Sequence, residues 1–295
     1  MRSYPLLVGL GLFALLAGPL TAADEKLEKR YRDYWFQAAE VNRYELTEQV
    51  YGQPRPGNAV LIYVTEPFDE KAGVKYEGRG PKTDVITVLK LNAMRTFLTG
   101  LYPYSLMTSV FTPYEPGYDV QPAKVTASMQ DWCGQSFYQL DHKDGGLIMQ
   151  WRSYFQAKGD GQEKMTDFPV EDNIWNQIRL APHGLPCGEC LMVPGFTYQR
   201  MGHFRPGPAK AVCELERSDQ THTYTITYPE LGRVLAITFE AAFPHKITGW
   251  RERRSEDGGW IEAKLTHTKI MPYWQQNRPG DIKLRRELGL PLSEG

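Results

Sequence analysis

Apolar and polar positions alternate along much of this chain, which predicts β-strands with one buried face. The alternation is clearest in residues 124–155, where Val125, Ala127 and Met129 alternate with polar residues. A bend follows at Asp131–Gly134, a second strand comes next, and a turn at residues 144–146 leads into a third strand. A glycine directly after Trp-Cys, inside such a pattern, indicates a β-bulge or a close approach of two backbone segments.

The rest of the chain predicts more antiparallel sheet around this centre. Residues 58–64 and 84–91 are apolar on both faces, as central strands are, while residues 223–241 and 246–271 read as two hairpins. No long linker or repeat interrupts the pattern. We therefore expect a mainly β fold, in which residues 24–295 form a single large domain of curved antiparallel sheet, barrel-like or sandwich.

Helical periodicity is confined to three short segments. Residues 25–41 carry an apolar stripe that includes Tyr31, Tyr34 and Trp35, residues 169–180 begin with Pro and two acids, and residues 281–288 are charged. We expect an N-terminal helix and one or two further short helices.

The first 23 residues predict a signal peptide. Arg2 precedes the apolar segment Leu6–Leu16, and the small residues Thr21 and Ala23 favour cleavage after Ala23. The apolar segment is shorter than the roughly 20 residues of a membrane span, although an uncleaved anchor is the alternative. We expect a periplasmic or secreted protein with no transmembrane segment in the mature chain.

Composition narrows the classes of partner. The formal net charge is −1, which argues against a general nucleic-acid binder. The chain has 17 Tyr, 12 Phe and 7 Trp, residues that favour strands and line apolar pockets. The six histidines show no metal-ligand spacing, and no nucleotide-binding motif is present, so the sequence predicts neither a metal nor a cofactor.

Four cysteines allow three complete disulfide pairings in an oxidising compartment. Cys187 and Cys190 are close enough in sequence to pair, and we predict a structural disulfide between them. A redox pair is disfavoured because Cys187 lies in a Pro-rich loop that leads into a strand, rather than at the start of a helix.

A candidate ligand site lies where the bend at Asp131–Gly134 meets the segment Tyr102–Ser105. Backbone groups at the bend, rigid aromatic rings and the polar side chains of the third strand would converge there. The alternative is a structural cluster in which Arg152 pairs with an acid such as Asp131. The candidate ligand-binding residues are Tyr102, Tyr104, Ser105, Trp132, Cys133, Arg152 and Tyr154.

Three functions are compatible with these patterns. The first is a binding or carrier protein for a partly apolar or lipid-like small molecule, held in an aromatic cavity under the curved sheet. The second is an envelope enzyme that uses Cys133 as a nucleophile, with His142 or His183 as base, or a carboxylate–His pair in the same cavity. The third is a structural component of the envelope.

Four segments resemble a family of uncharacterised secreted bacterial proteins and lipoproteins: Tyr102–Ser105, Asp131–Gly134, Ser153–Phe155 and Glu171–Arg179. With residues 60–66 and 84–92, the resemblance covers most of the mature chain up to about Arg200. Some members carry the automatic label "septum formation inhibitor Maf". The Maf nucleotide pyrophosphatases, however, are cytoplasmic α/β proteins with an N-terminal Ser-x-Ser-Pro-Arg-Arg loop that this chain lacks. The resemblance implies an architecture and a site position, but no reaction. It implies no lipid anchor here, since no Cys follows the apolar segment.

Overall fold

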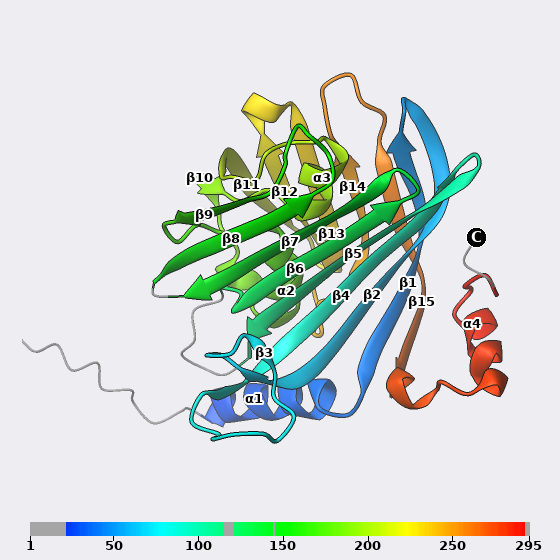
Figure 1. Ribbon diagram of the computed structural model, residues 1–295. Coiled ribbons are helices and arrows are strands. Elements are labelled where there is room, and N and C mark those ends of the chain that lie inside the picture. The colour runs from blue at the N-terminus through cyan, green and yellow to red at the C-terminus, as the bar shows by residue number, and fades with distance from the viewer. Residues whose placement is uncertain (1–21, 115–120, 144, 293–295) are drawn as a thin grey trace, which may run out of the picture.

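All fifteen strands in the described residues belong to one antiparallel sheet (Figure 1). The computed structural model describes residues 22–114, 121–143 and 145–292. The strand order is β10-β11-β12-β13-β14-β15-β1-β2-β4-β5-β6-β7-β8-β9, and β3 pairs with β2 beside this path. The predicted mainly β fold with a large curved antiparallel sheet is confirmed.

The strands and helices have the following bounds. The strands are Ala39–Val50 (β1), Gln53–Asp69 (β2), Val74–Lys75 (β3), Val85–Thr99 (β4), Tyr102–Pro113 (β5), Lys124–Asp131 (β6), Gly134–Lys143 (β7), Gly146–Ser153 (β8), Gly161–Met165 (β9), Gly188–Met192 (β10), Ala209–Arg217 (β11), Thr221–Tyr228 (β12), Arg233–Glu240 (β13), Ile247–Arg253 (β14) and Ile261–Met271 (β15). The α-helices are Ala22–Trp35 (α1), Glu171–Leu180 (α2), Phe196–Met201 (α3) and Lys283–Glu287 (α4). Short 3-10 helices are Pro182–Gly184 (η1), Pro229–Leu231 (η2), Tyr273–Gln275 (η3) and Pro279–Ile282 (η4).

The sheet rolls around α2 and α3, so that one face encloses the core and the other faces outward (Figure 1). Helix α2 packs on β4 and β5, and its Trp175 ring meets Trp250 of β14 with the ring centroids 5.1 Å apart. The roll is not closed by strand pairing. The segments that follow the edge strands β9 and β10 meet instead in a parallel bridge between Val170 and Val193.

Helix α2 is buried on almost every side and is fixed at both ends by ion pairs. At its start, Glu171 accepts hydrogen bonds from Arg233 of β13, and at its end, Arg179 donates two hydrogen bonds of 2.7 Å to Glu40 of β1. The sequence predicted an apolar buried face and an acidic first turn stabilised by the helix dipole. The structure buries the polar residues as well, and each end is held by a charge on the surrounding sheet.

The N-terminal helix is confirmed but ends earlier than expected. We predicted helix over residues 25–41, whereas α1 ends at Trp35 and β1 begins at Ala39. From Ala39 onward β1 pairs with β15 on one side, and from Glu40 with β2 on the other. Two ladders of backbone hydrogen bonds override the local helical preference of these residues.

The predicted strand–bend–strand–turn–strand unit corresponds to β6, β7 and β8. The bend at Asp131–Gly134 is a two-residue hairpin turn, in which Asp131 pairs with Gly134, rather than the expected bulge. The expected close approach is present: a Cβ atom on Gly134 would lie 2.7 Å from Cδ1 of Tyr154. Glycine is needed here because this aromatic ring packs on the backbone.

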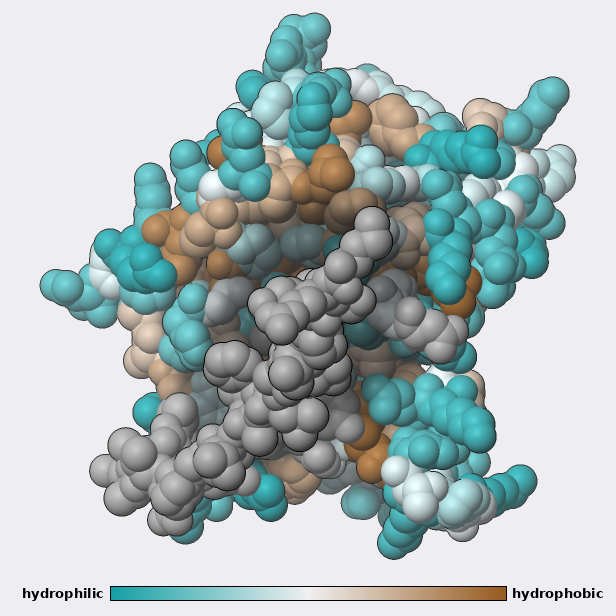
Figure 2. All heavy atoms as spheres, turned by 90° about the vertical axis from the view of Figure 1, so that its left-hand side faces the viewer, coloured by the Kyte–Doolittle hydropathy of each residue, from teal (hydrophilic) through white to brown (hydrophobic). Residues whose placement is uncertain are grey.

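On the side where β9 and β10 lie, hydrophilic side chains project and hydrophobic surface lies between them (Figure 2). Within the described ranges, no helix combines the length and the apolar character needed to cross a bilayer. The predicted signal peptide lies almost wholly in residues 1–21, outside the described residues.

Candidate functional site

Three hairpin tips lie side by side at one end of the sheet, at the upper right of Figure 1. The tips join β1 to β2, β4 to β5 and β6 to β7, and consist of residues 51–54, 98–104 and 131–134; we call them together the tip platform. The Tyr51 hydroxyl lies 3.2 Å from that of Tyr102 and 3.0 Å from that of Tyr104. The Tyr102 ring stacks on Trp132 with a centroid separation of 6.2 Å. Side-chain contacts therefore connect the tips.

The structure brings most of the predicted site residues to this region but distributes them over two faces of the sheet. Tyr102 and Tyr104 lie on the inward face of β5, where the Tyr104 ring is buried against Phe97. Ser105, Arg152 and Tyr154 lie on the outward face. Trp132 and Cys133 form the turn between the two faces. Strand alternation decides this division, because neighbouring residues of a strand point to opposite faces.

Ser105, Arg152 and Tyr154 line a hollow of about 720 Å³ over β5–β8, which we call the outer groove. A row of facing residues runs across the strands. Its part from Met107 to Arg152 forms the floor of the outer groove, and Met94 and Val60 extend this floor into an adjoining hollow. The register pairs these residues in the order Val60, Met94, Met107, Ser128, Phe137 and Arg152. The small Ser128 side chain lies between two large apolar ones, which deepens the floor at that point.

The hollow continues toward the C-terminal segment. A second hollow of about 370 Å³ lies between the outward face of β1–β5 and the segment containing α4. Ser105 and Met107 line both hollows, so the two form one elongated depression. At the far side, Leu284 and Leu288 provide an apolar wall.

Arg152 is the cationic residue in the lining of the outer groove. Its Nη1 donates to the backbone carbonyls of Trp151 (2.8 Å) and Gly161 (3.3 Å), and its Nε lies 3.9 Å from an oxygen of Asp160. The alternative pairing of Arg152 with Asp131 is not found. Asp131 is paired with Arg200 at 2.9 Å and also accepts the backbone N–H of Cys133 at 2.6 Å, so this carboxylate holds the turn in place.

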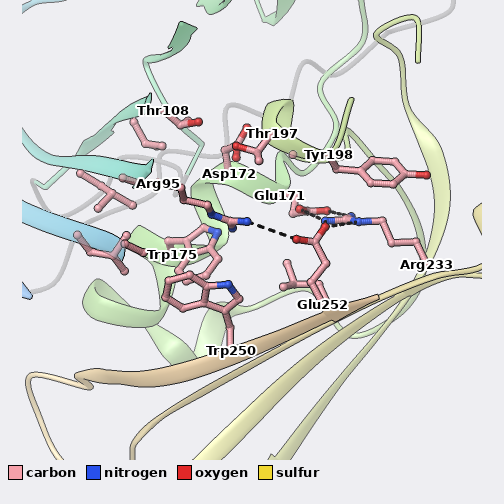
Figure 3. A pocket seen from close by; sticks show the side chains of 17 residues that line it. Arg95, Thr108, Glu171, Asp172, Trp175, Thr197, Tyr198, Arg233, Trp250 and Glu252 are labelled. Atoms are coloured by element: carbon pink, nitrogen blue, oxygen red, sulfur yellow. Dashed lines mark hydrogen bonds and ion pairs between the residues drawn. The ribbon is translucent and has the colours of Figure 1, made fainter. Parts of the chain in front are cut away.

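A second polar region lies inside the roll (Figure 3). Arg233 donates to Glu171 and, at 3.0 and 2.9 Å, to Glu252. Nη1 of Arg95 lies 3.6 Å from Glu252 and 3.7 Å from Glu48, and Arg254 contacts Glu48 at 2.9 Å. The cluster thus links residues of β1, β4, β13, β14 and α2, together with Arg254 just after β14, by charge.

The interior cluster strongly perturbs two carboxyl groups. Burial, with the neighbouring charge of Glu171, raises the pKa of Asp172 to about 7. Burial alone would raise the pKa of Glu252 too, but Arg233 and Arg254 hold it at about 2. Perturbed groups in a hollow can mark a functional site, and they also occur in structural ion-pair networks.

The size of the interior cavity favours the structural role. It measures about 40 Å³, and one water molecule needs roughly 10–15 Å³ of such space. Tyr198 Oη, Trp250 Nε1 and Arg95 Nη1 have no hydrogen-bond partner within the part of the chain that the structure describes, so the cavity offers mainly donors. Among the described residues, this interior cavity is much smaller than the large aromatic cavity expected under the sheet, because side chains of α2 and α3 fill the space.

The structure does not bring Cys133 together with His142, the first base considered for it. Cys133 is exposed at the end of β7 that contains Gly134, whereas His142 lies at the other end, roughly 27 Å away along the strand, and pairs with Asp167. His183 lies in η1, and no described imidazole is hydrogen-bonded to Cys133.

All four cysteines are free thiols, so the predicted disulfide between Cys187 and Cys190 is not formed in this structure. Cys190 lies within β10, and its sulfur is 4.0 Å from that of Cys213 on β11. Cys187 precedes the strand and contacts the Leu185 carbonyl oxygen. The extended backbone of β10 carries the Cys190 side chain toward the neighbouring strand.

Comparison with protein-family models, curated proteins and solved structures gives no significant match. The site is therefore defined by geometry alone.

Sequence reasoning missed the groove floor at Met94, Met107 and Phe137, although their outward positions in alternating strands were a usable signal. It also missed the partners of Glu171, because Arg233 is 62 residues away in sequence.

Proposed function

We propose that this is a periplasmic or secreted binding protein that holds an elongated amphiphile, with one apolar chain and an anionic head group, in the outer groove. The observation that carries the proposal is the row from Val60 to Arg152, which is apolar along most of its length and cationic at one end. The hollow of about 720 Å³ falls within the ~300–1,000 Å³ typical of small-molecule sites.

The dimensions of the row suit a long acyl-type chain. Val60 on β2 and Arg152 on β8 are separated by five strand spacings, or roughly 24 Å. Met94 and Met107 lie in the middle of the floor, and methionine side chains adapt to irregular apolar partners. The open side of the groove would leave part of the ligand in contact with water.

Arg152 would receive the anionic head group. Both hydrogen bonds that its guanidinium makes to described residues use Nη1, and the contact with Asp160 is too long to be a hydrogen bond. Nη2 can therefore donate to a carboxylate or phosphate oxygen, the geometry for which arginine is well suited.

The test is binding of dansyl-undecanoic acid, followed by its fluorescence. Ser128→Trp fills the groove at an exposed position and should weaken binding by about tenfold or more, equivalent to about 1.4 kcal/mol. Ser128→Ala removes the hydroxyl but leaves the groove open, and should bind as the wild type does. Arg152→Gln should weaken binding of the acid more than that of the corresponding dansyl alcohol. Equal binding by wild type and Ser128→Trp, with both folded, would refute the outer groove as the site.

Export is part of the proposal, supported by the predicted signal peptide and by the resemblance to secreted bacterial proteins. The secreted chain should begin at Asp24 on N-terminal sequencing. Peptide mapping without reduction then decides whether Cys190 is joined to Cys187, as the sequence spacing predicts, or to its spatial neighbour Cys213.

A further inference from the structure

We propose that the tip platform docks the protein on a lipid bilayer, and that the outer groove is loaded from that surface. The observations that support docking come from the tip platform alone. The loading step rests on the proposed function.

The charge content distinguishes these three tips from the opposite end of the same strands. The fifteen residues of the tip platform, 51–54, 98–104 and 131–134, contain one charged residue, Asp131, in a chain that is 23% charged. That carboxylate is buried in its pair with Arg200. At the opposite end of β2 and β4, the fifteen residues 70–84 contain seven charged residues: Glu70, Lys71, Lys75, Glu77, Arg79, Lys82 and Asp84. Of these two sets of residues, the tip platform is the one that can approach hydrocarbon without burying an unpaired charge.

The exposed side chains of the tip platform have the chemistry of a membrane interface. Leu101 is 79% exposed, Trp132 68% and Tyr51 67%. Trp and Tyr favour the head-group level of a bilayer, where the ring is apolar and the polar atom stays hydrated, while leucine favours the acyl region. Three adjacent tips present these residues together, which a scattered set of exposed apolar residues would not.

The tip platform is also held in shape. The hydroxyls of Tyr51, Tyr102 and Tyr104 lie within hydrogen-bonding distance, and the Tyr104 ring stacks on Phe97 with centroids 5.0 Å apart. The exposed residues are thus presented by a rigid base, and little ordering is needed on docking.

A continuous depression connects the tip platform to the outer groove. A hollow of about 390 Å³ surrounds the turn at Trp132 and Cys133. Gln130, Gln135 and Tyr154 line both this hollow and the outer groove. An amphiphile leaving a bilayer beneath the tips would therefore enter the groove at its Tyr154 end, beside Arg152.

The docking test is flotation with phosphatidylcholine vesicles. Leu101→Asp and Leu98→Asp should each lower the partition coefficient roughly tenfold, because a leucine that enters the acyl region is replaced by a charge. The matched control is Ile270→Asp on β15, since Ile270 is 47% exposed and Leu98 46%. This control should float as the wild type does. Acyl chains brominated near the head group should quench Trp132, and Trp132→Phe should remove that quenching.

Several results would overturn the docking proposal: no flotation of the wild type, equal flotation of the tip variants, or equal loss in Ile270→Asp. Self-association that Leu101→Asp abolishes, without vesicle binding by the wild type, would assign the tip platform to a second copy of this chain instead.

Loading is tested by the rate at which dansyl-undecanoic acid passes from vesicles to the protein. The rate should rise with vesicle concentration and fall about tenfold in Leu101→Asp, while binding of free probe in solution is unchanged. If Leu101→Asp loses vesicle binding but loads at the wild-type rate, loading from the bilayer is refuted and docking stands. If the wild type does not bind the free probe, the proposed function fails. The flotation result still decides docking.

Discussion

The apolar interior of the roll contains a cluster of buried charges, whereas the exposed tip platform is almost free of charge. Inside, Arg95 and Arg233 lie among Glu171, Asp172 and Glu252. At the tips, leucine and aromatic side chains face solvent. In most proteins, burial is the rule for apolar side chains and the exception for charged ones.

The difference shows which residues hold the fold together and which are available for contacts. The ion pairs of the interior cluster join residues of different elements, so the cluster fixes α2 and the two halves of the sheet relative to one another. The exposed tip residues Leu101 and Trp132 contribute no such link to the core. We therefore expect substitutions in the interior cluster to change the free energy of unfolding. Substitutions at the tip platform should change binding to the bilayer instead.

The largest contrast is expected in thiol reactivity. Burial, with the adjacent Cys190, raises the pKa of Cys213 to about 12, which leaves about a thousandfold less thiolate than in an ordinary thiol. Cys133 at the tip platform is exposed. Iodoacetamide at pH 8, read by mass spectrometry, should label Cys133 rapidly and Cys213 slowly in the native protein with all its cysteines reduced. In urea both should react alike. Equal native rates would contradict the assignment of Cys213 to the closed interior.

The next largest effect should follow from removing an interior charge. Arg233→Met leaves Glu171 and Glu252 buried without their main partner and should lower the free energy of unfolding by about 3–5 kcal/mol. Denaturant titration measures this loss. Lys210→Met is the matched control because its ion pair with Glu230 is exposed, and its denaturation midpoint should stay close to that of the wild type. Similar losses in both variants would show that the interior cluster does not fasten the roll.

Asp172 should make stability depend on pH. Its pKa is about 7 in the folded protein against 3.8 for the ordinary group, so the folded state keeps a proton that the unfolded state has lost. This contribution is fully present below pH 3.8 and is lost as pH rises through 7. Asp172→Asn mimics the protonated form and keeps an acceptor for the Phe196 N–H.

The urea midpoint of Asp172→Asn should therefore equal that of the wild type near pH 4 and exceed it at pH 8. Asp33→Asn, at an exposed ion pair, serves as the control and should follow the wild type at both pH values. A wild-type advantage at pH 8 would contradict a protonated, buried Asp172.

The smallest effect on stability is expected at the tip platform. Leu101→Asp should change the free energy of unfolding by no more than about 0.5 kcal/mol, because Leu101 is exposed. Denaturant titration of the variant measures this. A loss of unfolding free energy as large as that of Arg233→Met would mean that the tips are part of the core. It would contradict the contrast between the two regions.

The sequence by itself determined the strands of residues 124–155 and 223–241, the helix at Glu171–Leu180 and the gathering of aromatic residues near Tyr102 and Trp132. These features are local, since a two-residue repeat and a turn-forming segment act over a few neighbouring residues. The pairing of Asp131 with Arg200, rather than Arg152, was not accessible in this way, because 69 residues separate the two partners.

Only the tertiary structure decided which residues share a site. The row from Val60 to Arg152 depends on the register of five strand pairs, and a shift of one residue in any of them would turn the following side chains to the other face. The curvature of the sheet brings Arg233 to Glu171. It also leaves the interior cavity with room only for water. Local alternation fixes the two faces of each strand. Long-range packing fixes which face encloses the core and which one carries the groove.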